Sequence, residues 1–255
     1  MPEIESVPET SVLLAIFERP QKIDAFQSTL LQTVSTLTRK KIVWELVSFP
    51  THVSEPEGRK RVFEAFVQSK HTHLVCLDAD LTFSAEDLAF LIETAKPGTV
   101  LGAACPLPKI RWGQVKDALA PLELPTTLNT AEEAKAYSDQ VAKVLAGCLE
   151  YSLVLPSQPT HEIVQGKMVV DTIGFGCTVV PRDVAEKVLR SEDHKESAFG
   201  DSSTLSEVAF CNAVRETGGC VYVHVGMNVT RVAFQTFPGS LLDVFQQSGA
   251  TMKSE

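Results

Sequence analysis

The chain has 255 residues, of which 44% are hydrophobic and 22% charged, a composition typical of a globular protein with a sizeable core. A net charge of −9 disfavours DNA or RNA binding as the main function, because nucleic-acid-binding proteins usually have a basic surface stripe. No apolar run approaches the roughly 20 residues of a membrane helix, and the polar first residues do not resemble a signal peptide. We therefore expect a soluble protein without a membrane span, cytoplasmic or, if viral, in the host cytoplasm.

Strands and helices alternate through the first hundred residues. Continuous apolar runs are typical of strands buried on both faces, and apolar residues at helical spacing predict the helices between them. The predicted strands are 11–17, 41–49, 73–77 and 99–104, and the predicted helices are 23–38, 56–69 and one that Ser84 opens with Asp87 three residues on. This alternation predicts an α/β fold with a parallel, Rossmann-like sheet, whose ligands collect at the carboxyl ends of the strands.

The second half of the chain lacks this regular alternation. From 105 on we predict an irregular stretch to 125, a helix at 130–147, strands within 151–170, a Gly-rich apolar segment at 171–181, helices at 182–190 and 205–217 around a polar loop, and a strand at 220–225. We expect a single domain in which residues 11–104 form a nucleotide-binding half, residues 105–240 an acceptor-side half and residues 241–255 a flexible tail.

Side chains that often mark sites elsewhere give weaker signals. Most of the six cysteines lie inside apolar runs and none are spaced for zinc, which predicts buried free thiols. Trp44 fits the core of a strand. His224 closes the strand at 220–225 and is a candidate metal ligand, although a structural role is the simpler interpretation.

The sharpest chemical signal is Asp78-Ala79-Asp80, which directly follows the apolar run 73–77. A buried strand that ends in two carboxylates places negative charge at a ligand crevice, and this is costly unless a cation or hydrogen bonds neutralise it. A divalent metal that bridges to a diphosphate does so and also stabilises the departing phosphate. The alternative is a pair of turn carboxylates with no chemical role.

Two enzyme classes end a strand in this way. Haloacid-dehalogenase-type phosphohydrolases carry Asp-x-Asp-x-Thr, which Asp78 to Thr82 match literally; there the first Asp is the nucleophile and the second the acid/base. Such an enzyme also needs a downstream Lys and Asp, and Gly200-Asp201 is the only loose candidate. The other class is the GT-A glycosyltransferases.

Several blocks of the chain, in the right order, favour the second class. The first blocks are the helix that begins near Gly58-Arg59, the Asp-x-Asp strand and the helix after it. They are followed by VLGAACPLPKIRW, the loop GFGCT and the helix start EVAFC. Together they cover about residues 55–115 and 170–240. This set resembles a soluble group of GT-A glycosyltransferases of phage, viral and bacterial genomes, which implies a Rossmann-like, mostly parallel sheet flanked by helices.

The resemblance also implies roles for individual residues. The nucleotide-sugar would be bound by Ala15, Phe17, Arg19, Arg59, Asp78, Ala79, Asp80 and Arg231, and the sugar or acceptor by Lys109, Trp112, Gly174, Phe175 and Gly176. Asp80, with Asp78, would hold Mn²⁺ or Mg²⁺. For Arg59 a helix-surface charge, and for the glycines a tight turn, are the simpler alternatives.

Two positions depart from the family pattern. The family has Glu-Asp where this chain has Ser206-Glu207; Glu207 keeps a carboxylate and is our candidate for the base that deprotonates the acceptor. The alternative is a helix N-terminal carboxylate that the helix dipole favours. Arg231 matches the position after the last strand where the family usually has a His that binds the metal. Arginine is a poor metal ligand but pairs well with phosphate.

The sequence thus predicts a hexosyl- or pentosyltransferase that moves a sugar from a nucleoside-diphosphate-sugar to a hydroxyl of a glycan, a protein or a modified nucleobase, the last being the one way in which nucleic acid would be a partner. A non-catalytic nucleotide-sugar or glycan-binding module on the same fold and the phosphohydrolase are the alternatives. The donor sugar and base, retention or inversion, and the oligomeric state stay open.

Overall fold

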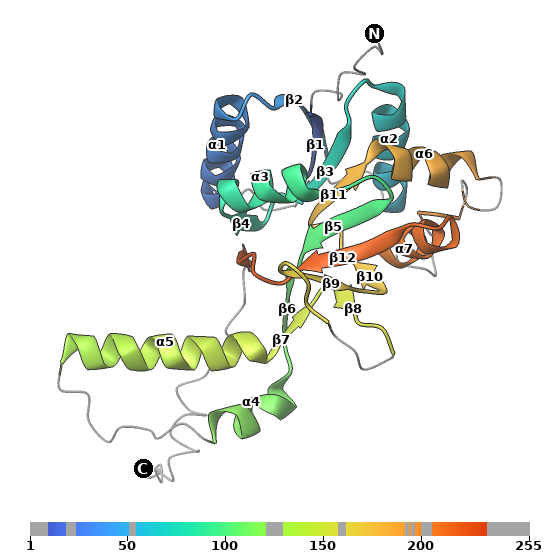
Figure 1. Cartoon of the computed structure of the whole chain (residues 1–255). Helices are drawn as coiled ribbons and strands as arrows, with labels where there is room; N and C mark the ends of the chain where they lie inside the picture. Colours follow the sequence, from blue (N-terminus) through green and yellow to red (C-terminus); the bar gives the residue numbers. More distant parts are fainter. Residues whose placement is uncertain are drawn as a thin grey trace, which may run out of the picture.

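The computed structural model describes residues 10–18, 24–50, 55–120, 130–157, 162–191, 194, 197–199 and 206–233. They form a seven-stranded sheet with helices on both faces (Figure 1). The helices are α1 (Asp24–Arg39), α2 (Glu55–Gln68), α3 (Ala85–Thr94), α4 (Trp112–Leu119), α5 (Ala131–Gly147), α6 (Arg182–Arg190) and α7 (Ser206–Glu216). None of these helices combines the length and apolarity that crossing a bilayer takes.

The main sheet contains β1 (Ser11–Phe17), β2 (Val43–Phe49), β3 (His73–Asp78), β5 (Thr99–Ala103), β9 (Lys167–Val169), β11 (Cys177–Pro181) and β12 (Cys220–His224). Their order is β2-β1-β3-β11-β5-β12-β9, and only β11 and β9 run antiparallel to their neighbours. The mostly parallel sheet that the sequence predicts is confirmed. Because β11 lies between β3 and β5, strands from both halves of the chain build one sheet.

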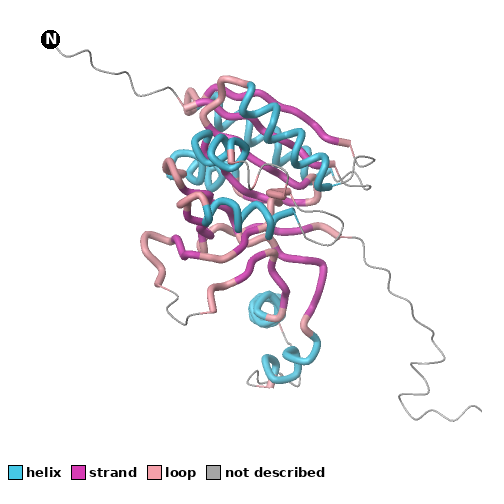
Figure 2. The backbone as a smooth tube through the Cα atoms, turned by 90° about the vertical axis from the view of Figure 1, so that its right-hand side faces the viewer, coloured by secondary structure: helices cyan, strands magenta, loops and turns pink. Residues whose placement is uncertain are grey.

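Three short ladders lie outside the main sheet. They pair β4 (Leu81–Phe83) with β13 (Val229–Arg231), β6 (Pro106–Ile110) with β7 (Leu149–Tyr151), and β8 (Leu153–Val154) with β10 (Thr172–Ile173). Figures 1 and 2 show α4 and α5 at the far end of the β6–β7 ladder, set apart from the main sheet. The irregular stretch predicted from 105 is therefore wrong for β6 and α4, while residues 121–125 lie outside the described part.

Two apolar layers sandwich the sheet. Side chains of α2, α6 and α7 cover one face, with Phe63, Val184 and Phe210 fully buried. Side chains of α1 and α3 cover the other, with Leu37 and Leu88 fully buried. These helices have the amphipathic pattern that a three-layer fold requires, and α3 begins as predicted, since the Ser84 side chain accepts a hydrogen bond from the amide of Asp87.

The edge of the sheet corrects one prediction. β2 is an edge strand, and most of its side chains are exposed. Trp44, predicted in the strand core, is therefore 37% exposed and donates its indole N–H to Thr38 Oγ1 at 3.0 Å. Five cysteines are buried free thiols as predicted, whereas Cys220 at the start of β12 is exposed.

Candidate active site

Asp78 is the last residue of β3, and the neighbouring strands extend their hydrogen bonding to it. Its amide donates to the carbonyl of Gly176 at 2.8 Å, and the amide of Ala79 donates to the carbonyl of Phe17 at 3.0 Å. All residues of β3 after His73 are buried. The apolar run before Asp78 therefore fixes the carboxylate at the carboxyl end of β3, next to the end of β1, as the sequence predicts.

Two arginines neutralise the Asp78 carboxylate. Arg59 Nη2 lies 3.3 Å from Oδ1, and Arg231 Nη2 lies 2.7 Å from Oδ2. The Asp78 side chain is only 4% exposed, so these ion pairs lie in a poorly solvated environment where an unpaired charge would be costly. We refer to Arg59, Asp78, Asp80 and Arg231 as the charge quartet.

Arg59 reaches the quartet from the second turn of α2 and is 1% exposed. Its guanidinium carbon lies 3.6 Å from the centroid of the Phe17 ring and 5.0 Å from that of Phe175. The faces of aromatic rings attract cations, and arginine is weakly hydrated, so it can be buried in this way. The interpretation of Arg59 as a helix-surface charge is therefore wrong.

Arg231 reaches the quartet through the ladder of β13 with β4. Arg231 pairs with Leu81 in this ladder, directly after Asp80, and the carbonyl of Asp80 accepts the amide of Val232 at 2.8 Å. The Nε atom of Arg231 lies 3.3 Å from Asp80 Oδ2. One guanidinium thus contacts both carboxylates, and the four side chains together carry no net charge.

A cavity of about 800 Å³ adjoins the quartet. Lys109 and Trp112 line it together with Arg231, while neither Asp78 nor Asp80 is among its lining residues. Trp112 is 67% exposed, as its position in a loop led us to expect, although it is the first residue of α4. The cavity lies between the β6–β7 ladder and the β13 segment, and Arg231 connects it to the aspartates.

Glu207 is partly buried in the first turn of α7, where the Ser206 hydroxyl donates to its Oε2 at 3.2 Å. Burial raises the pKa of the Cys76 thiol to about 12. The charge of Arg59 lowers this pKa, and the charges of Asp78 and Glu207 raise it. Glu207 is not among the residues that line the cavity beside the quartet.

Comparison with solved structures identifies the architecture. The crystal structure of GalNAc-T7 with UDP, GalNAc and Mn²⁺ matches with a TM-score of 0.51 and 8% identity, over 88% of this chain and 44% of that chain. The fold is the GT-A fold. At this identity the match shows the fold alone, and the chain spans less than half the length of GalNAc-T7.

Two other solved structures align over most of this GT-A chain with lower scores. A197 from STIV has a TM-score of 0.48 at 15% identity, with 87% of this chain and 86% of that chain covered. The inositol-1-phosphate CTP transferase from T. maritima has a TM-score of 0.40 at 9% identity, with 95% and 96% covered. No family model and no curated protein matches the sequence.

The Gly-rich loop predicted to approach a sugar or acceptor is buried inside the protein. A Cβ atom on Gly174 would lie 2.7 Å from the Ser152 side chain, and one on Gly176 would lie 3.2 Å from Asp78 Oδ2. Phe175 is 1% exposed and packs against Phe63 and Phe210. The loop therefore shapes the surroundings of Asp78 through close backbone packing.

The first strand contributes its end to the site. Phe17 lies beneath Arg59, whereas Ala15 is fully buried in the middle of β1 and pairs with Cys76. Arg19 lies outside the described residues, as do Gly200 and Asp201. Phe17 is thus the residue of this predicted group that the structure brings to the quartet.

A metal ion would find few ligands here. Both oxygens of Asp78 face guanidinium groups, and within the described residues no three His, Cys, Asp or Glu side chains form a group that could hold a metal. His224 packs instead against the Phe90 ring, 5.4 Å between centroids. Asp80 is 18% exposed, and a carboxylate suits Mg²⁺ or Mn²⁺. These ligands fit a cation that is bound jointly by Asp80 and a diphosphate. They do not fit a cation that the protein binds without a substrate.

Sequence reasoning missed the ion pairs between Arg231 and the aspartates. It placed Arg231 after the last strand and assigned it to phosphate, but Arg231 is the last residue of β13 and lies 153 positions from Asp78. No local pattern marks the β4–β13 ladder, since each strand has only three residues. The stacking of Arg59 on Phe17 and Phe175 has no sequence signal either, because the three residues come from separate elements.

Proposed function

We propose that the chain is a glycosyltransferase that moves a sugar from a nucleoside-diphosphate-sugar to a hydroxyl acceptor. The observation that carries this proposal is the charge quartet at the carboxyl end of β3, beside a cavity of about 800 Å³, on a GT-A fold. The carboxyl ends of parallel strands are where open α/β sheets bind nucleotides.

Arg59 and Arg231 are the groups that would bind the donor diphosphate. Guanidinium groups pair bidentately with phosphate, and Arg231 already lines the cavity. Phe17, at the end of β1, and Ala79 lie next to them and would border the nucleotide. Asp80 would hold Mn²⁺ or Mg²⁺ together with the diphosphate, and such a cation would neutralise charge on the departing group.

The acceptor would enter through the cavity. Trp112 offers an exposed aromatic face for stacking on a sugar or base, and Lys109 offers hydrogen-bond donors beside it. In transfer, the acceptor oxygen bonds to the anomeric carbon while the bond from that carbon to the diphosphate oxygen breaks. We assign to Glu207 the removal of the acceptor proton, and the nucleoside diphosphate leaves with the electron pair of the broken bond.

The test is transfer and donor hydrolysis by the purified chain, with a panel of nucleoside-diphosphate-sugars, in Mn²⁺ and in chelator. Asp80→Asn should lower turnover at least about 100-fold, the size expected when a group that stabilises charge in the transition state is removed. Asp139→Asn, an exposed carboxylate on α5, is the matched control and should leave turnover unchanged. Full activity of Asp80→Asn would refute the proposed role of this site.

A non-catalytic nucleotide-sugar-binding module is the second candidate. The observation that favours it is the double ion pairing of Asp78, which leaves the quartet without net charge before any substrate binds. Saturable donor binding without turnover across the panel would select this candidate. The phosphohydrolase is disfavoured because its nucleophile would be Asp78, whose 4% exposed carboxylate is enclosed by two arginines.

A further inference from the structure

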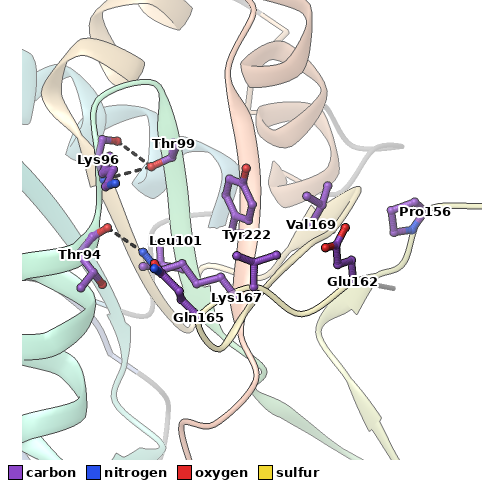
Figure 3. A pocket seen from close by; sticks show the side chains of 11 residues that line it. Thr94, Lys96, Thr99, Leu101, Pro156, Glu162, Gln165, Lys167, Val169 and Tyr222 are labelled. Carbon is purple, nitrogen blue, oxygen red and sulfur yellow. Dashed lines mark hydrogen bonds between the residues drawn. The ribbon is translucent and has the colours of Figure 1, made fainter. Parts of the chain in front are cut away.

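A second cavity, of about 600 Å³, lies away from the charge quartet (Figure 3). Thr99, the first residue of β5, lines it, whereas Asp78 is the last residue of β3, and the two strands run in the same direction. The two cavities share no lining residue. The second cavity therefore lies along β5, β12 and β9, from Thr99 at the start of β5 to Lys167, which pairs with His224 at the end of β12.

The floor of this cavity is apolar and aromatic. Tyr222 on β12 pairs with Leu101 on β5 and with Val169 on β9, so the three side chains lie side by side on one face of the sheet. Figure 3 shows the Tyr222 ring between Leu101 and Val169. Val169 is 50% exposed, and an apolar surface of this kind gains free energy when a ligand covers it.

Lys167 is held at the cavity by a tight hairpin. Val164 and Lys167 exchange both backbone hydrogen bonds across Gln165 and Gly166, which have φ values of 53° and 75°, as in a type I′ turn. The amide of Val225 donates to the Gly166 carbonyl at 2.9 Å and ties the turn to the end of β12. The turn is thus anchored, and its lysine has a defined position.

Lys167 Nζ donates one hydrogen bond, to the Thr94 carbonyl at the end of α3, at 2.9 Å. Among the described residues no other hydrogen bond of Lys167 Nζ is recorded, and because an ammonium group has three donors, two are open to a ligand. Lys96 also lines the cavity. The pKa of Lys167 is lowered, first by desolvation on burial and then by the charge of Lys96.

The two lysines lack acidic partners in the part of the chain that the structure describes, where no ion pair is recorded for either. Glu162, the acidic residue of the lining, lies across the cavity from them (Figure 3). The cavity therefore has a cationic wall, an apolar floor and an acceptor on the far rim.

We propose that this cavity is a second ligand site, for a small organic anion whose phosphate or carboxylate group pairs with Lys96 and Lys167 and whose ring lies on Leu101, Val169 and Tyr222. The Glu162 carboxylate is placed to accept a hydrogen bond from the far end of such a ligand. This site is independent of sugar transfer, because it shares no residue with the quartet.

The test is calorimetric titration of the purified full chain with phenyl phosphate, benzoate and inorganic phosphate, each with and without saturating UDP. We expect phenyl phosphate to bind more tightly than inorganic phosphate, because the ring covers the floor, and to bind whether or not UDP is present. Lys96→Ala should weaken phenyl phosphate about tenfold, as expected for the loss of a charged hydrogen-bond donor. Lys135→Ala, which removes an exposed lysine on α5, controls for net charge.

Each outcome decides the proposal. Tighter binding of phenyl phosphate assigns the site to phosphates, and equal or tighter binding of benzoate assigns it to carboxylates. Equal binding of inorganic and phenyl phosphate overturns the role of the floor. The proposal is also overturned if none of the probes binds, if Lys96→Ala binds like wild type, or if UDP displaces phenyl phosphate. A chain that binds phenyl phosphate but transfers no sugar would refute only the proposed function.

Discussion

Positive side chains gather at two places on the main sheet, the charge quartet and the second cavity, but their charges are balanced in different ways. At the carboxyl end of β3, Arg59 and Arg231 are paired with Asp78 and Asp80 inside the protein. In the second cavity, along β5, β12 and β9, no ion pair of Lys96 or Lys167 is recorded among the described residues. The arginines are thus already paired with carboxylates before any ligand arrives, whereas no acidic partner of the lysines is recorded among the described residues.

This difference follows from solvation. A guanidinium is weakly hydrated and stacks on aromatic rings, so Arg59 can be buried between Phe17 and Phe175. An ammonium is strongly hydrated, and Lys167 lies at an open cavity, where its Nζ donates to the Thr94 carbonyl. We therefore expect substitution of the buried Arg59 or Asp78 to lower stability strongly, and substitutions at the second cavity to affect mainly ligand binding.

The largest expected effect is at Arg59. Arg59→Ala should lower the free energy of unfolding by about 3–5 kcal/mol, because it removes one partner of a buried ion pair, measured by urea denaturation. Arg61→Ala, an exposed neighbour on α2 paired with Glu57, should change stability by less than about 1 kcal/mol.

A double-substitution cycle sharpens this test. If the buried charge of Asp78 causes the loss, Arg59→Ala combined with Asp78→Asn should be less destabilised than the sum of the two single variants. Equal stability of Arg59→Ala and Arg61→Ala would show that the buried ion pair of Arg59 does not contribute more to stability than an exposed one.

Gly176 is the next most sensitive position. A Cβ atom there would lie 3.1 Å from Leu81 Cδ1 and 3.2 Å from Asp78 Oδ2, so Gly176→Ala should cost about 1–3 kcal/mol through overpacking and weaken donor binding. Gly147→Ala on α5 meets nothing within 4 Å and should be neutral or slightly stabilising in the same thermal and urea unfolding measurements.

At the cavity, Gly166→Ala should cost about 1–2 kcal/mol, because alanine is strained at a φ of 75°, and its Cβ would lie 3.0 Å from His224 Nε2. It should also weaken phenyl phosphate binding by shifting Lys167. Gly218→Ala has a similar φ of 83° and no neighbour within 4 Å. A matching loss of stability without a loss of binding in that variant would separate backbone strain from the displacement of Lys167.

The smallest effect is the pH dependence that Lys167 contributes. Its pKa is lowered in the folded protein, so the unfolded chain binds this proton more tightly and stability should rise as pH increases through the folded pKa toward 10.5, the ordinary value. Lys167→Met should show a flatter stability profile over this range in urea titrations. Profiles that coincide would show that Lys167 is not desolvated at the cavity.

Local patterns in the sequence were enough to predict most of the first half of the fold. The apolar runs of β1, β3 and β5, the Ser84 cap of α3 and the position of Asp78 at a strand end depend on residues close together in the chain. The alternation of strands and helices predicted the α/β class for the same reason. Lys109 and Trp112, predicted for the acceptor, and Arg231, predicted for the nucleotide-sugar, line one cavity, and their roles stay predictions.

Tertiary structure alone decided which strands are neighbours and which charges meet. The insertion of β11 between β3 and β5, the exposed edge position of Trp44 and the contact of Arg231 with residues 153 positions away depend on packing between distant segments. Hydrophobic periodicity records whether a residue is buried, but not what it is buried against. The sequence by itself therefore determined a strand that ends in two carboxylates, and only the folded chain determined that two arginines neutralise them.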